Sequence, residues 1–131
     1  MTVKPKILLV EDDTDLATAY KTRMEAEGFN VSRCDNGESA LTMALDFRPD
    51  LIVLDIMMPR ISGFDVLDIL RNTPETKNIK IIILSALSQP TDIEKARKLG
   101  VDEYLVKSQA VISDVMSRIR YHLGMEETAA K

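Results

Sequence analysis

Short apolar runs alternate with segments of helical periodicity along most of the chain. Each run is a few residues long and is bounded by polar, glycine or proline residues, which is typical of buried strands. We predict strands over residues 6–10, 30–34, 50–54, 79–84 and 102–106. The segments between them carry apolar residues three and four positions apart, which predicts helices over 13–27, from 36 or 37 to 47, and over 63–71, 89–99 and 111–123.

This alternation of strands and helices predicts an α/β fold. The strands are apolar through most of their length, as expected of strands buried on both faces of a sheet. Helical crossovers between such strands produce a five-stranded parallel sheet with helices on both faces, a doubly wound arrangement. With 131 residues, the chain has the length of one domain. We expect that domain to span residues 1–124 and residues 125–131 to form a disordered tail.

The composition narrows the class of protein. Apolar residues make up 45% and charged residues 29% of the chain, which is a globular rather than a disordered composition. With a net charge of −4 the chain lacks the basic surface of a nucleic-acid binder, and its single cysteine excludes an internal disulfide framework. The apolar runs are too short to cross a bilayer, and the N-terminus has no hydrophobic signal core. We therefore expect a cytoplasmic protein with no direct nucleic-acid or membrane partner.

The candidate chemistry lies at the carboxyl ends of the predicted strands, where ligands bind in open parallel sheets. The second strand ends in Cys34 and Asp35 and is expected to contribute no group to a site. The other strands are followed by polar side chains: Glu11, Asp12 and Asp13 after the first, Asp55 after the third, Ser85 after the fourth and Lys107 after the fifth. The sequence therefore predicts an acidic rim that also carries a lysine and a hydroxyl.

Such a rim suits phosphoryl transfer. Two carboxylates about 5 Å apart repel by roughly 3 kcal/mol at an effective dielectric of about 20, so a cation should neutralise them. Carboxylate oxygens suit Mg²⁺, which keeps several waters and binds phosphoryl oxygens. A carboxylate can also attack phosphorus and form an acyl phosphate. Mg²⁺, a lysine and a hydroxyl donor would then stabilise the charge that develops on the phosphoryl oxygens.

Several short motifs stand at these strand ends in one order along the chain. They are Leu8-Leu9-Val10-Glu11-Asp12-Asp13, Leu51-Ile52-Val53-Leu54-Asp55-Ile56-Met57-Met58-Pro59, Gly63, Leu84-Ser85-Ala86 and Gly100-Val101-Asp102-Glu103-Tyr104-Leu105-Val106-Lys107. Together they make the chain resemble the receiver domains of bacterial two-component response regulators, in particular the single-domain chemotaxis type. The resemblance covers essentially the whole chain, and it implies a flavodoxin-like sheet with strand order 2-1-3-4-5.

The resemblance also implies a phosphorylation site and a metal site. Asp55 would be the phosphoacceptor. Asp55 and Asp12 would bind Mg²⁺ directly, together with the backbone carbonyl of Met57, and Glu11 would hold the ion largely through water. Asp13 has no role in that pattern, and we expect it to be a helix N-cap.

A conformational switch and its partners are implied in the same way. Lys107 would pair with the phosphoryl group, Ser85 would donate its hydroxyl to it, and Tyr104 would turn inward. The phosphoryl group would come from the phosphohistidine of a histidine kinase or a phosphotransfer protein. The chain would catalyse its own phosphorylation and dephosphorylation, but it would be a signalling switch rather than an enzyme. Its output would be an unidentified downstream protein or a phosphorylation-dependent homodimer through helix 89–99, strand 102–106 and helix 111–123.

Three other functions compete with this interpretation. A phosphatase of the haloacid-dehalogenase kind needs a second aspartate two residues after the nucleophile, where this chain has Met57. A flavin binder needs a phosphate cradle after the first strand, where Glu11 and Asp12 would repel a phosphate. A receiver-like module that binds partners without phosphorylation stays open as an alternative.

The chain departs from the family pattern directly after Lys107, where Ser108 replaces the usual proline. The family's Lys-Pro bond is typically cis, but a cis bond before a residue other than proline costs roughly 2.5–4 kcal/mol. We therefore expect a trans bond here and a changed path for residues 107–110. Because Lys107 precedes the altered bond and has a long side chain, we still expect its ammonium within salt-bridge distance of Asp55.

Overall fold

The computed structural model describes residues 3–125, which contain a sheet of five parallel strands. The strand order is β2-β1-β3-β4-β5, which confirms the predicted fold class and the order implied by the resemblance. The strands are β1 (Lys6–Val10), β2 (Asn30–Cys34), β3 (Leu51–Leu54), β4 (Lys80–Ser85) and β5 (Glu103–Val106).

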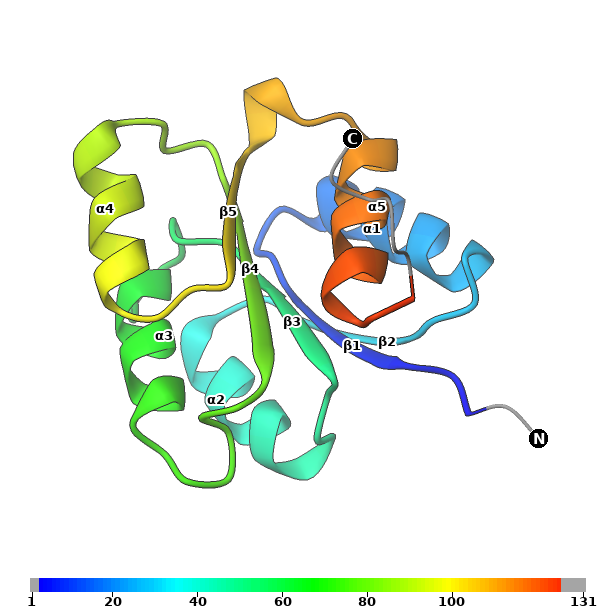
Figure 1. Ribbon diagram of the computed structural model, residues 1–131, viewed down its shortest axis with the longest axis horizontal. Helices are drawn as coiled ribbons and strands as arrows, with labels where there is room; N and C mark the ends of the chain where they lie inside the picture. The colour runs from blue at the N-terminus through cyan, green and yellow to red at the C-terminus, as the bar shows by residue number, and fades with distance from the viewer. Residues whose placement is uncertain (1–2, 126–131) are drawn as a thin grey trace.

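Helices cover both faces of this sheet (Figure 1). Successive strand residues point to opposite faces, so Leu8 joins one core while Ile7 and Leu9 join the other. This two-sided burial is the reason why the strands are nearly continuous apolar runs in the sequence. On one face lie α1 (Thr14–Ala26) and α5 (Ile112–His122), and on the other lie α2 (Gly37–Asp46), α3 (Gly63–Arg71) and α4 (Pro90–Lys98).

The observed helix ends differ from the prediction mainly at the caps. The predicted helices over 13–27, 89–99 and 111–123 are each one residue too long at both ends, because those ranges include the capping residues. Asp13 is the N-cap of α1, as expected, and its carboxylate accepts a hydrogen bond from the backbone N–H of Leu16 at 3.0 Å.

The connection from β5 to α5 contains a short 3-10 helix, η1 (Lys107–Gln109), which the sequence pattern did not predict. No cis peptide bond occurs among the described residues, so the Lys107–Ser108 bond is trans, as expected. Residues 126–131 of the expected tail lie outside the described residues. Within residues 3–125, no helix is both long enough and apolar enough to cross a membrane.

Candidate functional site

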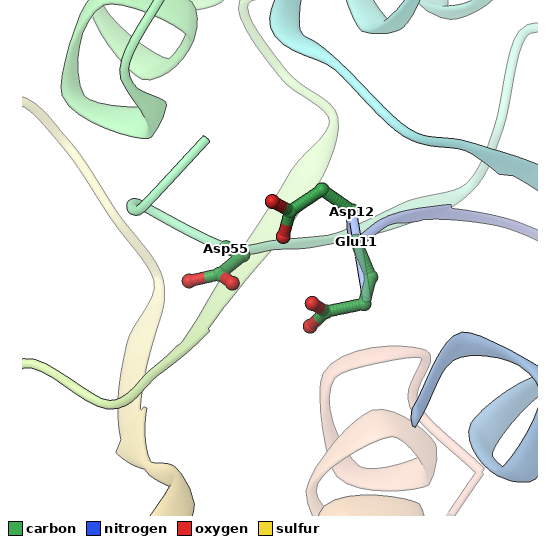
Figure 2. Close-up of side chains that lie close together, drawn as sticks. All are labelled: Glu11, Asp12 and Asp55. Carbon is green, nitrogen blue, oxygen red and sulfur yellow. The ribbon is translucent and has the colours of Figure 1, made fainter. Parts of the chain in front are cut away.

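The site is built where β1 and β3 end side by side in the middle of the sheet. Val10 lies opposite Leu54 in the pairing of these strands, so the residues that follow them are neighbours. Carboxylate oxygens of Glu11, Asp12 and Asp55 all lie within 4.8 Å of one another. Figure 2 shows the three side chains gathered at this edge. The predicted acidic rim is therefore present, and its members come from two adjacent strand ends.

Lys107 enters this cluster from the end of β5. Its Nζ lies 2.9 Å from Glu11 Oε1 and 3.0 Å from Asp55 Oδ2, which confirms the expected contact with Asp55. Glu11 and Asp55 are both only 3% exposed, whereas Asp12 is exposed. The ammonium thus bridges the two buried carboxylates and leaves Asp12 at the solvent side.

Burial and pairing act in opposite directions on the charged groups of the cluster. Burial raises the pKa of the Glu11 carboxyl, and the hydrogen bond from Lys107 offsets only part of that effect. For Lys107, burial acts to lower the pKa, but the hydrogen bonds to Glu11 and Asp55 and the negative charges of these two groups together outweigh it and raise the pKa overall. The ammonium is therefore charged at neutral pH and supplies a permanent positive charge beside Asp55.

Backbone groups orient the two buried carboxylates. The N–H of Met57 donates to Asp55 Oδ1 at 3.2 Å, and the N–H of Asp13 donates to Glu11 Oε2 at 3.1 Å. Each carboxylate thus has one oxygen bonded to the backbone and the other bonded to Lys107. Such fixed orientation before a ligand arrives favours reactions that depend on positioning.

Gly63 lets the start of α3 approach the backbone of Asp55. A Cβ atom on Gly63 would lie 2.3 Å from the carbonyl oxygen of Asp55 and 2.6 Å from the Cα of Ile56. Both are backbone atoms that a rotamer change cannot move away. Any side chain at position 63 would therefore displace α3 from the strand end that carries Asp55.

Arg33 of β2 contributes to the site, and the expectation that this strand contributes no group is wrong. Its Nε and Nη2 donate to the backbone carbonyl oxygen of Glu11 at 3.0 and 2.7 Å. The backbone N–H of Glu11 in turn donates to the carbonyl of Cys34. Arg33 therefore clamps the backbone that carries Glu11 and Asp12. No motif points to this role, because the acceptor is a main-chain carbonyl.

Two side chains hold Leu87: Ser85, the last residue of β4, and Tyr104, the second residue of the neighbouring β5. Ser85 is fully buried, and its Oγ accepts a hydrogen bond from the N–H of Leu87 at 3.2 Å. The hydroxyl of Tyr104 donates to the carbonyl of Leu87 at 2.7 Å. The loop between β4 and α4 is thus tied to both side chains through Leu87.

The donor set fits Mg²⁺. Three clustered carboxylates share one ammonium, which contacts only Glu11 and Asp55, so negative charge is in excess, and all the carboxylate oxygens are hard ligands. Glu11, Asp12 and Asp55 could hold such an ion, and the resemblance adds the backbone carbonyl of Met57 as a further ligand. The ion would neutralise the carboxylates and the oxygens of a bound phosphoryl group.

Neutralising Asp12 tests this charge excess. Within residues 3–125, no ion pair involves Asp12, so Asp12→Asn should relieve repulsion and stabilise the metal-free protein by up to about 1 kcal/mol after solvent screening. Mg²⁺ should raise the Tm of the wild type and raise that of Asp12→Asn much less. Asp46→Asn, at the far end of α2, is the control and should keep the full effect of Mg²⁺. If Mg²⁺ raised the Tm of the wild type and of Asp12→Asn by the same amount in thermal melts, Asp12 would not be a ligand of the ion.

The comparisons with known proteins agree with this geometry. The response regulator receiver domain family matches residues 7–120. The transcriptional regulatory protein CpxR of Escherichia coli is 44% identical over 102 residues, which are 78% of this chain and 42% of CpxR. The receiver domain of the Francisella response regulator 1452 is 33% identical with a TM-score of 0.85, covering 92% of this chain and 98% of that one. The BeF₃-activated N-terminal receiver domain of Klebsiella pneumoniae RstA is 26% identical with a TM-score of 0.84, covering 90% and 97%.

The match covers all five strands except Lys6, the first residue of β1, and the buried residues of both cores. It includes β1 and β3, which carry the acidic cluster, and most of α5. The chain spans about half the length, or less, of curated relatives such as CpxR, so the likeness concerns their receiver part. The chain belongs to the response regulator receiver domain family and is a signalling module rather than an enzyme with a separate substrate.

Proposed function

We propose that this receiver is activated by phosphorylation of Asp55. The observation that carries the proposal is the setting of this carboxylate, which is buried between the Met57 N–H and the Lys107 ammonium and faces Glu11 and Asp12. A carboxylate oxygen of Asp55 would attack the phosphorus of the donor. A new O–P bond forms while the bond from phosphorus to the leaving group breaks, and the electron pair departs with that group. Lys107 then stabilises the negative phosphoryl oxygens.

The experiment for this proposal is phosphorylation by a small-molecule donor. The protein is incubated with acetyl phosphate and Mg²⁺, and the intact mass and peptide map are recorded. We expect the mass of one added phosphoryl group, located on Asp55 and removed by hydroxylamine as an acyl phosphate should be. An unchanged mass in the presence of bound Mg²⁺ would favour the alternative, a receiver-like module that binds partners without phosphorylation.

The family supports a proposal for the class of phosphoryl donor, and the output is a proposal of its own. Receiver domains take phosphoryl groups from histidine kinases, so a histidine kinase or a phosphotransfer protein would supply this one. Several relatives are named as transcriptional regulators, but the chain covers less than half of CpxR. For the receiver itself, we propose as output an unidentified downstream protein or a phosphorylation-dependent homodimer through α4, β5 and α5.

Phosphorylation would act on the loop that Ser85 and Tyr104 share. If the Ser85 side chain rotated so that its hydroxyl donated to a phosphoryl oxygen, Oγ would move away from the N–H of Leu87, which would lose its acceptor. The carbonyl of the same residue is the acceptor for Tyr104, so a moved loop would also release the tyrosine. The consequence would be a population shift in which Tyr104 turns inward and α4 moves. Ala96 is the one fully buried side chain of α4, so few contacts resist that motion.

Chemical shifts can test this switch. Addition of beryllofluoride, a phosphoryl mimic, with Mg²⁺ should shift the amide signals of residues 85–99 as well as those that touch Asp55. Tyr104→Phe removes the hydroxyl that holds the Leu87 carbonyl and should alter the shifts of this loop before any ligand is added. Tyr121→Phe, at an exposed tyrosine, is the control and should not. Beryllofluoride shifts confined to the immediate neighbours of Asp55 would count against the switch.

A further inference from the structure

Asp12 is the member of the acidic cluster whose side chain no other group holds in place. Glu11 and Asp55 each receive one hydrogen bond from a backbone N–H and another from the Lys107 ammonium. Asp12 is exposed, and within residues 3–125 no protein group donates a hydrogen bond to its carboxylate. The direction of this carboxylate toward the other two (Figure 2) therefore depends on the backbone on either side of Asp12.

The backbone after Asp12 is fixed by the start of α1. The N–H of Asp13 donates to Glu11 Oε2 at 3.1 Å, and the Asp13 carboxylate caps the helix through the N–H of Leu16 at 3.0 Å. The backbone before Asp12 is the peptide unit that joins it to Glu11. This unit is planar and contains both the Glu11 carbonyl and the Asp12 N–H, so whatever holds that carbonyl also orients Asp12.

The sheet stops supporting the chain at this peptide unit. The N–H of Glu11 still donates to the carbonyl of Cys34, the last residue of β2, at 3.1 Å. Beyond Cys34 the chain turns away, and Asn36 is already the N-cap of α2. Arg33 then supplies two side-chain donors, and its Nε and Nη2 lie 3.0 and 2.7 Å from the Glu11 carbonyl oxygen. A planar guanidinium thus holds the peptide that leads into Asp12.

Arg33 makes this contact although carboxylates are available nearby. Asp35 and Glu38 line the same cleft as Arg33, and arginine commonly pairs with carboxylates. Within residues 3–125, however, Arg33 forms no ion pair, and Glu38 pairs with Arg60 instead. The guanidinium is partly buried, and both of its hydrogen bonds go to one main-chain oxygen of the site.

We infer that Arg33 is a positioning residue for the metal, which strengthens Mg²⁺ binding by orienting Asp12. The inference rests on the proposed Mg²⁺-assisted phosphorylation of Asp55. With the guanidinium in place, the carboxylate of Asp12 is directed toward Glu11 and Asp55 before the ion arrives. Without it, the peptide between Glu11 and Asp12 is free to rotate, and this ordering has to occur on binding.

The charge of Arg33 and its hydrogen bonds have opposite effects on a cation. A positive charge beside the acidic cluster repels Mg²⁺, so loss of the charge alone should tighten binding. Loss of the two hydrogen bonds to the Glu11 carbonyl should weaken it. Arg33→Met removes both at once, and the sign of the change shows which effect is larger. We expect Mg²⁺ binding to weaken about tenfold, as is typical when groups that orient metal ligands are removed.

The test is an NMR titration of the full chain with Mg²⁺ as the added ligand. Arg33→Met should raise the dissociation constant about tenfold and shift the amide signals of Asp12 and Asp13 before Mg²⁺ is added. Arg33→Lys keeps the charge without the two-donor fork and should lose less affinity. Arg97→Met, at an exposed arginine of α4, is the control and should bind as the wild type does.

The combination with Asp12→Asn tests whether Arg33 acts through Asp12. In that background, Arg33→Met should change the dissociation constant less than about twofold, because the residue that it orients is no longer a carboxylate. With acetyl phosphate, Arg33→Met should be phosphorylated slowly at low Mg²⁺ and should approach the wild-type rate at saturating Mg²⁺. Urea denaturation checks that each variant is folded, and if Arg33→Met is not, the same comparisons are made with Arg33→Lys.

Two results would overturn the inference about Arg33. Unchanged or tighter Mg²⁺ binding by the folded variant would show that the contact with the Glu11 carbonyl does not support the metal site. An equal loss of affinity with and without the Asp12 carboxylate would show that Arg33 does not act through Asp12. Either result leaves the proposed function standing if the wild type binds Mg²⁺ and is phosphorylated, whereas a wild type that does neither would overturn both.

Discussion

Asp55→Asn should leave the protein folded and unable to take up a phosphoryl group. The amide is close in size to the carboxylate and can still accept the Met57 N–H, so the local backbone should persist. An amide oxygen is a poor nucleophile toward phosphorus, and the substitution also removes a candidate metal ligand. With acetyl phosphate and Mg²⁺, the intact mass should therefore stay that of the unmodified protein at times when the wild type is largely modified.

Asp13→Asn is the matched control for the loss of phosphorylation expected in Asp55→Asn. Asp13 lies beside the cluster but caps α1, and asparagine caps helices about as well as aspartate. This variant should be modified at the wild-type rate. If Asp55→Asn took up a phosphoryl group on another side chain at a comparable rate, Asp55 would not be the phosphoacceptor, and another carboxylate of the acidic rim would be.

Lys107→Met should lower the free energy of unfolding by about 2 kcal/mol in the absence of divalent ions. The change leaves Glu11 and Asp55, each 3% exposed, without the cation that bridges them. Breaking a fully buried ion pair costs roughly 3–5 kcal/mol, and the side chain of Lys107 is 21% exposed, so water reduces that loss. Urea denaturation with and without Mg²⁺ measures the effect.

Mg²⁺ should restore part of the lost stability, because its charge replaces that of the ammonium near the same carboxylates. Lys80→Met is the control, since Lys80 is half exposed and lies 3.9 Å from its partner Asp102. That variant should stay within about 0.5 kcal/mol of the wild type. If both lysine variants lost the same small amount of unfolding free energy, the bridge from Lys107 to Glu11 and Asp55 would not contribute to stability.

Most secondary structure could be predicted because its causes are local. The run Leu51-Ile52-Val53-Leu54 is apolar and lies between two aspartates, and it forms β3. The helices α1, α4 and α5 deviate from prediction only at their capping residues. Apolar spacing and caps are properties of neighbouring residues, so a single sequence contains the information.

Part of the site could be predicted for a topological reason. Carboxyl ends of parallel strands share one edge of the sheet, so Glu11, Asp12, Asp55 and Lys107 could be expected near one another once the strands were recognised. The role of Arg33 could not be predicted. An arginine in an edge strand is usually exposed to solvent, and its acceptor is a carbonyl 22 residues away that has no side-chain signature.

The sequence by itself determined the alternation of strands and helices, the burial of the strands on both faces and the kinds of groups at the strand ends. The strand order came from the resemblance and not from periodicity. Only the tertiary structure decided that Lys107 bridges Glu11 and Asp55, and that Gly63 must be small because α3 starts against the Asp55 backbone. These features depend on which strands pair and how helices pack across the sheet, and contacts between residues far apart in the chain leave no local pattern.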